Sequence, residues 1–257
     1  MKLIDTHTHL YLKEFDVDFD QVVNNSKVIG VKKFIFPSIH SKYNQRMIDA
    51  HNKDKSIFKI MAGLHPAYVS GNNDKEIDLV KKNLENYDCV AVGEIGIDLH
   101  WEKKFLDQQK FVFQKQIELA LNYNLPIVIH CREAFDHIYE ILIKYSKTNL
   151  RGVFHCFTGN EAQAKKICDL NFKLGIGGVV TFKNGGLDKF LNNINLKNIV
   201  LETDSPYLAP APYRGKRNNS SYLIHIVDKL SEIYGVENHE IASITTNNAI
   251  ELFNLDN

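Results

Sequence analysis

The chain has 257 residues, 44% of them hydrophobic and 24% charged, with 31 basic and 31 acidic side chains and a formal net charge of zero. This composition is typical of an ordinary globular protein, and it excludes a protein that holds nucleic acid mainly through a strongly basic surface. An early charge at Lys2 and the lack of an uncharged apolar run of about 18 residues argue against a secretory leader and a membrane span, so we expect a cytoplasmic protein.

Short apolar runs rich in β-branched residues recur along the chain, with helical patterns between them. We predict eight strands, at residues 3–9, 33–38, 58–65, 89–94, 126–131, 152–156, 172–177 and 199–204. Each step from one strand to the next is long enough for one helix. The pattern predicts that residues 1–257 form one domain of the α/β class, a TIM-like (β/α)8 barrel, with a doubly wound open sheet as the alternative.

Three helices and one long loop are the clearest elements between and after these strands. Residues 105–121 carry apolar side chains at spacings of three and four, and residues 222–234 and 239–253 read as two closing helices. Residues 206–221 are rich in proline, glycine, asparagine and basic residues without an apolar period, which predicts a long loop after the last strand.

A His-x-His pair ends the first predicted strand. Side chains two residues apart share one face of a strand, so Leu3, Asp5, His7 and His9 are expected to point the same way. Two imidazoles that converge in this manner can ligate one metal ion. For this pair alone, packing in the core is an equal alternative.

Four more potential ligands stand at the carboxyl ends of predicted strands. They are Glu94, His130, His155 and Asp204. Barrel enzymes build their active sites at this end, so we expect all six side chains to meet there. The alternation that turns the two histidines inward turns Cys131 and Cys156 toward the helices, which argues against thiolate ligands.

Four imidazoles and two carboxylates exceed the three protein ligands that a catalytic zinc usually takes. We therefore predict two divalent cations with Glu94 as the bridge between them. The histidine-rich set favours Zn²⁺, with Mg²⁺ or Mn²⁺ as alternatives. We expect Asp5 and Glu202, one pleat deeper, to accept hydrogen bonds that orient the ligands, with buried ion pairing as the alternative.

Six motifs give the chain a clear resemblance to the TatD family of metal-dependent deoxyribonucleases, within the amidohydrolase-like hydrolases. They are Asp-Thr-His-Thr-His-Leu at 5–10, Gly-Leu-His-Pro at 63–66, Gly-Glu-Ile-Gly-Ile-Asp at 93–98, Ile-His-Cys-Arg-Glu at 129–133, Phe-His-Cys-Phe-Thr-Gly at 154–159 and Glu-Thr-Asp-Ser-Pro-Tyr-Leu at 202–208. The resemblance implies a TIM-like barrel and a divalent-metal phosphodiesterase that acts on DNA, expected to be a 3′-5′ exonuclease.

The resemblance also implies roles for single residues. Carried over motif by motif, these are His7, His9 and Asp204 on one metal ion, His130 and His155 on the other, Glu94 as the bridge, and His65 and Arg132 near the scissile phosphate. The chain departs from the family pattern at Asn219-Ser220-Ser221, where Glu-Pro is expected, and this bears on substrate contacts more than on the metal site.

The expected chemistry is attack on phosphorus by a metal-bound hydroxide, because a metal lowers the pKa of its bound water to near 7. Asp204 is expected to orient that water or take its proton, so it joins Glu94 and His65 as a catalytic candidate. The basic side chains expected to contact the substrate, together with His65, are Arg132, Arg214, Lys216 and Arg217. For His65 a structural role is the alternative, and for the basic loop a solvated surface.

Two other functions stay open at this point. One is a binuclear-metal hydrolase of small amides, lactones or phosphotriesters, and the other is a non-catalytic, metal-stabilised binding scaffold. The run Gly175-x-Gly177-Gly178 lacks the spacing of a dinucleotide site, so we predict no nucleotide cofactor. We expect a monomer that takes DNA as its substrate.

Overall fold

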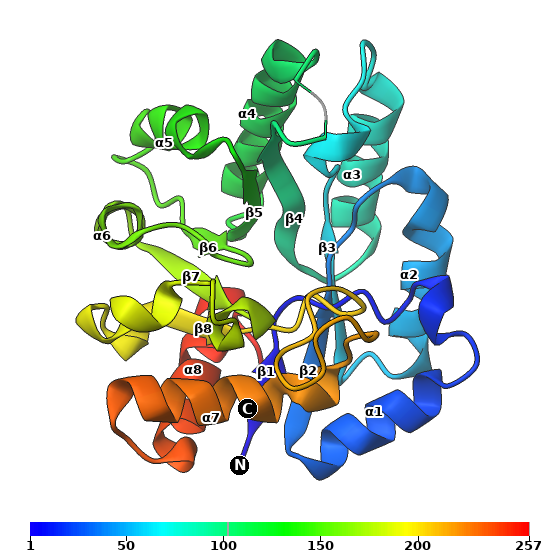
Figure 1. The fold of residues 1–257 in the computed structure, drawn as a ribbon. Coiled ribbons are helices and arrows are strands. Elements are labelled where there is room, and N and C mark those ends of the chain that lie inside the picture. Colours follow the sequence, from blue (N-terminus) through cyan, green and yellow to red (C-terminus); the bar gives the residue numbers. More distant parts are fainter. Residues whose placement is uncertain (102, 257) are drawn as a thin grey trace.

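The computed structural model describes residues 1–101 and 103–256, and at its centre eight parallel strands form one sheet that curls into a nearly closed barrel (Figure 1). The strands are β1 (Leu3–Asp5), β2 (Val31–Phe36), β3 (Phe58–Ala62), β4 (Cys89–Asp98), β5 (Ile127–Arg132), β6 (Gly152–Phe154), β7 (Phe172–Ile176) and β8 (Ile199–Leu201). They are neighbours in sequence order, which confirms the (β/α)8 prediction and contradicts the doubly wound alternative.

Backbone hydrogen bonds beyond the last residues of β1 and β8 bring the two ends of the sheet together. Thr6 N–H donates to the Leu201 carbonyl at 3.0 Å, and Asp204 N–H donates to the His7 carbonyl at 2.9 Å. His9 N–H then donates to the Ser205 carbonyl at 2.8 Å. The two segments that carry predicted ligands are therefore fixed against each other although neither is a regular strand there.

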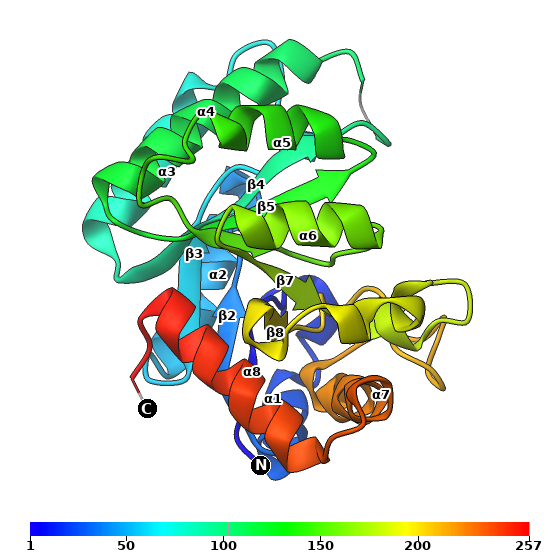
Figure 2. The same ribbon diagram turned by 90° about the vertical axis from the view of Figure 1, so that its left-hand side faces the viewer.

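Helices surround the barrel on its outside, as Figures 1 and 2 show. They are α1 (Phe19–Val28), α2 (Ser41–Lys53), α3 (Asp74–Asn86), α4 (Leu106–Asn122), α5 (Phe135–Ile143), α6 (Glu161–Asp169), α7 (Leu223–Tyr234) and α8 (Asn238–Phe253). The predicted helices at 105–121, 222–234 and 239–253 correspond to α4, α7 and α8 within one residue at each end. Among the described helices, none combines the length and hydrophobicity that crossing a bilayer requires.

The connection from β7 to β8 differs from the others, because the described chain forms short 3-10 helices there in place of an α-helix. They are η3 (Gly178–Thr181), η4 (Leu187–Lys189), η5 (Leu191–Asn193) and η6 (Leu196–Asn198). Gly185 and Gly186 interrupt the segment, and Gly186 adopts a left-handed conformation at φ 72°. Glycine in this conformation is unfavourable inside a helix, so the crossover stays short and irregular.

An apolar cluster fills the interior of the barrel on the side away from the carboxyl ends of the strands. Its strand residues include Ile4, Ile35, Met61, Ala91, Val128, Val153 and Val200, and α8 adds Ala249, Leu252 and Phe253. The interior position of β1 is therefore Ile4, whereas Leu3 packs in the separate cluster between sheet and helices. This corrects the expectation that Leu3 and Asp5 face inward, and the reason is that β1 ends at Asp5, so strict alternation does not reach His7.

Register places polar side chains directly above this apolar floor. His130 and His155 lie two residues beyond Val128 and Val153, on the same inward side, and β4 pairs with β5 so that Asp98 lies beside Arg132. The carboxyl end of the barrel therefore presents charged and imidazole groups, as barrel enzymes do at this end.

Candidate metal centre

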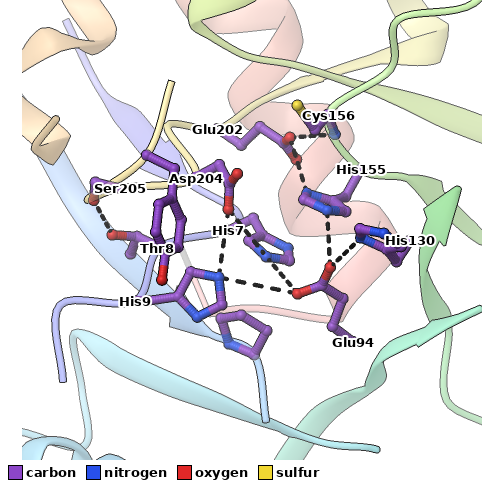
Figure 3. Close-up of polar contacts among 12 residues, drawn as sticks. His7, Thr8, His9, Glu94, His130, His155, Cys156, Glu202, Asp204 and Ser205 are labelled. Atoms are coloured by element: carbon purple, nitrogen blue, oxygen red, sulfur yellow. Dashed lines mark hydrogen bonds and ion pairs between the residues drawn. The ribbon is translucent and has the colours of Figure 1, made fainter. Parts of the chain in front are cut away.

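The six side chains predicted as metal ligands meet at the carboxyl end of the barrel (Figure 3). They are His7 and His9 after β1, Glu94 in β4, His130 in β5, His155 directly after β6 and Asp204 after β8. These side chains, together with His65, form three groups, and within each group the donor atoms all lie within 4.8 Å of one another. The groups are His7 with His155 and Asp204, His7 with His9 and Glu94, and His65 with Glu94 and His130. The six side chains selected from the sequence therefore lie together, although they come from five different segments of the chain.

Glu94 occupies the centre of this cluster. Its Oε2 lies 3.3 Å from Nε2 of His7 and 3.9 Å from Nε2 of His9. Its Oε1 lies 2.8 Å from Nδ1 of His130 and 3.0 Å from Nε2 of His155. Each carboxylate oxygen thus faces a different pair of histidines, which is the arrangement that a ligand bridging two cations requires.

Asp204 closes the cluster on the side of His7 and His9. Its Oδ1 lies 3.4 Å from Nε2 of His9 and 3.8 Å from Nε2 of His7. Burial acts to raise the pKa of Asp204, but the contact with Nε2 of His9 and the charges of His155 and His7 hold it below its usual value. The carboxylate is therefore ionised at neutral pH and keeps 14% of its side chain exposed at the mouth of the site.

The tautomer of His9 follows from its neighbours. The Tyr11 hydroxyl donates to the Pro37 carbonyl at 2.6 Å, so its oxygen accepts from Nδ1–H of His9 at 3.0 Å. In a neutral ring this leaves Nε2 unprotonated, and Nε2 is the nitrogen that faces Glu94 and Asp204. Sequence reasoning missed Tyr11, although its position two residues after His9 was an available signal.

His130 is oriented in the same way by a carboxylate that was also missed. Its Nε2–H donates to Oδ2 of Asp98 at 2.8 Å, which leaves Nδ1 to face Glu94. Burial acts to raise the pKa of Asp98, but the bonds from His130 and from the Trp101 backbone N–H hold it at about 2. The alternation of Glu94, Gly96 and Asp98 along β4 was the signal that could have identified this carboxylate.

Glu202 lies against His155, as expected from its place one pleat below Asp204. Its Oε1 is 3.3 Å from Nδ1 of His155, and it also accepts a hydrogen bond from the Cys156 N–H. Gly175 makes room for this carboxylate, since a Cβ at that position would lie 2.3 Å from Oε2 of Glu202. Gly175 of β7 therefore allows close packing beneath the cluster.

Asp5 takes a different place from the one expected. Its carboxylate accepts hydrogen bonds from the Thr203 N–H at 2.9 Å and from the Thr203 hydroxyl at 2.7 Å. It therefore fixes the backbone next to Asp204 and does not contact an imidazole of the cluster. The break in alternation after β1 is the physical reason for this difference.

The cluster holds opposite charges close together. Burial acts to raise the pKa of Glu94, but His65, His155 and His7 hold it well below its usual value. Burial acts to lower the pKa of His155, but Glu94 and Glu202 raise it well above its usual value. Because a ligand imidazole must be unprotonated on the nitrogen that binds, metal binding here must be accompanied by loss of a proton.

Some buried polar atoms of the site make no hydrogen bond, as expected of atoms that ligate a cation. Both ring nitrogens of His7 are buried and make no hydrogen bond with any described residue. Burial and the neighbouring His155 lower the pKa of His7, so its imidazole is neutral and able to ligate. Buried polar atoms are rarely left unpaired, and a cation beside His7 and Glu94 would give Nε2 of His7 a partner.

His65 joins the cluster from the segment after β3 and lies with Glu94 and His130. Its Nδ1 accepts a hydrogen bond from the Ala67 N–H at 3.0 Å. In a neutral ring the proton is then on Nε2, which lies 3.2 Å from Oε1 of Glu94. His65 thus presents an N–H donor to the site.

The four basic residues predicted to contact the substrate are engaged in different ways. The Arg132 guanidinium lies over the Trp101 ring, and that of Arg214 lies over the Phe182 ring at 4.0 Å. Lys216 is exposed on its loop. Arg217 forms an ion pair with Asp18, with Nη1 at 3.0 Å from Oδ1, so its charge is already compensated. Arg217 and Asp18 are 199 positions apart in the sequence, so the loop sequence alone could not predict this ion pair.

The segment that departs from the family pattern is well anchored. Asn219 caps the short helix η7 (Ser220–Tyr222) by accepting from the Ser221 N–H. The preceding Asn218 donates to the carbonyls of Thr203 and Tyr207 at 2.8 and 2.7 Å. The loop is therefore tied to both sides of Asp204, and the departure does not loosen that ligand.

Replacing Asp98 with alanine is expected to weaken metal binding about tenfold to a hundredfold, because His130 loses the carboxylate that orients it. Titration calorimetry of metal-free protein with Zn²⁺ measures this directly. Asp98→Asn keeps a hydrogen-bond acceptor and should lose less. An alanine variant that binds metal as tightly as the parent would show that the His130–Asp98 contact does not support the site.

Comparison with known proteins gives similarity along the whole chain. The family described as TatD related DNase matches residues 4–254. YabD of Bacillus subtilis, called an uncharacterized metal-dependent hydrolase, is 35% identical over 255 residues, covering 99% of this chain and 100% of YabD. YcfH of Escherichia coli K12, described in the same words, is 30% identical over 261 residues, covering 100% of this chain and 97% of YcfH.

A solved structure agrees with these sequences. The crystal structure of YjjV, a TatD homologue from Escherichia coli K12, matches this fold with a TM-score of 0.92 at 28% identity. The match covers 99% of this chain and 98% of YjjV. The similarity therefore includes every strand end that carries a cluster residue.

Proposed function

The chain belongs to the TatD family of metal-dependent hydrolases, and from this premise we propose that it is a divalent-metal phosphodiesterase that cleaves DNA from the 3′ end. The observation that carries the proposal is Glu94, whose two oxygens face two separate pairs of histidines. Two-metal sites with such a bridge are used for in-line displacement at phosphorus by phosphatases and nucleases. In this proposal residues 1–257 act as one catalytic unit.

The residues that would hold the two cations follow the two oxygens of Glu94, one of which faces His7 and His9 and the other His130 and His155. His7, His9 and Asp204 would hold one cation, His130 and His155 the other, and Glu94 would bridge them. When bound, the cations supply Lewis-acid polarisation of a phosphoryl oxygen and lower the pKa of a water toward 7. Imidazole ligands favour zinc, and manganese or magnesium are the alternatives to test.

In this proposal Asp204 takes a proton from the attacking water. Its Oδ1 faces His7 and His9, and its side chain is the more exposed of the two carboxylates in the cluster, at 14% against 4% for Glu94. Its pKa lies below the usual value, so it is an ionised acceptor at neutral pH. A positioned carboxylate of this kind contributes about a hundredfold to ten-thousandfold to a proton transfer.

In this proposal His65 and Arg132 contact the phosphoryl oxygens of the substrate. His65 presents Nε2–H toward the centre because its Nδ1 accepts from the Ala67 N–H, so it donates a hydrogen bond to a phosphoryl oxygen. Arg132, at the end of β5 two residues after His130, compensates the charge that grows on the phosphoryl oxygens.

The proposal is tested by replacing Arg132 with methionine, which removes the charge and keeps much of the side-chain volume. Cleavage of an end-labelled single-stranded oligonucleotide should fall roughly tenfold to a hundredfold in kcat/KM, because one cationic donor to the phosphate is lost. Turnover of a neutral carboxylic ester by the same protein should change little.

Arg151 offers a matched control, because it lies before β6 at the opposite end of the barrel and binds Asn124. Arg151→Met should leave DNA cleavage unchanged. Equal losses on DNA and on the neutral ester would favour a hydrolase of small uncharged substrates. Failure of the parent protein to cut DNA with Zn²⁺, Mn²⁺ or Mg²⁺ would rule out the proposed function.

A further inference from the structure

Trp101 lies next to the metal centre and is largely exposed. It is the only tryptophan of the chain, and 69% of its surface is accessible. It lies in the loop after β4, three residues beyond Asp98, which is the last residue of that strand. Large aromatic side chains are usually highly buried, so an exposed indole beside a catalytic centre points to a ligand.

The loop that carries Trp101 is fixed to a side chain that touches the cluster. Oδ1 of Asp98 accepts hydrogen bonds from the backbone N–H groups of His100 at 2.8 Å and Trp101 at 3.0 Å. Oδ2 of the same carboxylate accepts from Nε2–H of His130. One buried carboxylate therefore positions both a predicted metal ligand and the backbone of Trp101.

Arg132 lies against the indole. Its guanidinium carbon is 5.5 Å from the ring centroid of Trp101, within the range of a cation–π interaction. Register places Arg132 beside Asp98, and its carbonyl accepts a hydrogen bond from the Leu99 N–H at 3.0 Å. The phosphate-binding candidate and the exposed aromatic ring are thus neighbours on a common backbone frame.

We propose that Trp101 and Arg132 form a nucleobase subsite at the edge of the metal centre, where an unpaired base stacks on the indole while its phosphate meets the guanidinium. This rests on the proposed function, since it names the part of a nucleic acid that this side of the site recognises. Base stacking on aromatic side chains tolerates any base, because every base has a π face, and arginine beside the ring strengthens it.

The chain offers a direct readout, because tryptophan fluorescence excited where tyrosine does not absorb reports Trp101 alone. The probe is a phosphorothioate single-stranded oligonucleotide that resists hydrolysis, added to the metal-loaded full-length protein. Stacking should quench the emission as DNA binds. A matched oligonucleotide with abasic residues keeps the phosphates without the bases and should leave the emission nearly unchanged.

Substitution supplies the second measurement. Trp101→Leu should weaken binding of the intact oligonucleotide roughly tenfold by fluorescence anisotropy and have little effect on the abasic one. Trp101→Phe should restore part of that affinity. Tyr123→Leu is the matched control, since Tyr123 is 40% exposed but follows α4 at the opposite end of the barrel, and its affinity should equal that of the parent.

The outcomes separate this subsite from the proposed function. Unchanged emission at saturating DNA, or equal losses by Trp101→Leu on intact and abasic oligonucleotides, would overturn the subsite even if the protein cuts DNA. Base-dependent quenching supports it even if no tested metal gives cleavage, in which case the proposed function alone fails.

Discussion

Replacing Glu94 with alanine is expected to remove both cations and to lower DNA cleavage by at least about a thousandfold, because a metal centre supplies several kcal/mol of transition-state stabilisation. Among the described residues, Glu94 alone faces His7, His9, His130 and His155 together. Without it, Asp204 still faces His7 and His9, but no carboxylate lies between the two pairs of imidazoles. Metal content by mass spectrometry and oligonucleotide cleavage measure the two effects.

The barrel of this variant should remain folded. The apolar floor formed by residues such as Ile35, Met61 and Val128 lies below the cluster and does not depend on Glu94. Glu94→Gln, which keeps the volume but not the shared negative charge, should resemble the alanine variant. Glu118→Ala on the outside of α4 should behave as the parent. A Glu94→Ala protein that keeps both metals and normal turnover would contradict the bridge.

The fold was largely predictable, because buried parallel strands read as short apolar runs. Each of the eight predicted ranges contains or overlaps one observed strand. The limits of the strands were not predictable to the same degree. β1 and β8 end early because the segments after them pair through single hydrogen bonds, and Asp204 has a positive φ of 55° that no periodic pattern announces.

The meeting of the six proposed ligands was predictable for a related reason. Each follows or ends an apolar run, and parallel strands place their carboxyl ends at one edge, so residues far apart in sequence had to meet there. The partners of those ligands were harder to identify. Tyr11 and Asp98 act through hydrogen bonds that depend on the rotation of the His9 and His130 rings, and sequence spacing does not specify a side-chain rotation.

The basic residues of the loop after β8 were grouped by their closeness in sequence, and the structure separates them. Arg214, Lys216 and Arg217 formed one group in the sequence because they are close together there. In the structure the first stacks on Phe182 and the last pairs with Asp18. A run of like charges in a loop does not predict which partner each side chain contacts, because long side chains can reach different partners.

Removing the cations with a chelator is expected to abolish cleavage, by about ten-thousandfold or more, and to destabilise the fold. The first effect follows because His65, Arg132 and Asp204 can position substrate and move a proton but cannot polarise a phosphoryl oxygen as divalent cations do. The second follows because ligands that bind only the native state stabilise it, by about 4 kcal/mol at a thousandfold excess over Kd. Cleavage assays and thermal unfolding before and after chelation measure both.

Restoring one metal at a time tells which cation the site prefers. Recovery with Zn²⁺ at low concentration is expected from four imidazole ligands, and a requirement for high Mg²⁺ would shift the assignment toward the carboxylates Glu94 and Asp204. The buried Nε2 of His7 explains why stability should follow occupancy, since without a cation it lacks any hydrogen-bond partner among the described residues. Stripped protein that cuts DNA as fast as the loaded form would remove the metal centre from the reaction altogether.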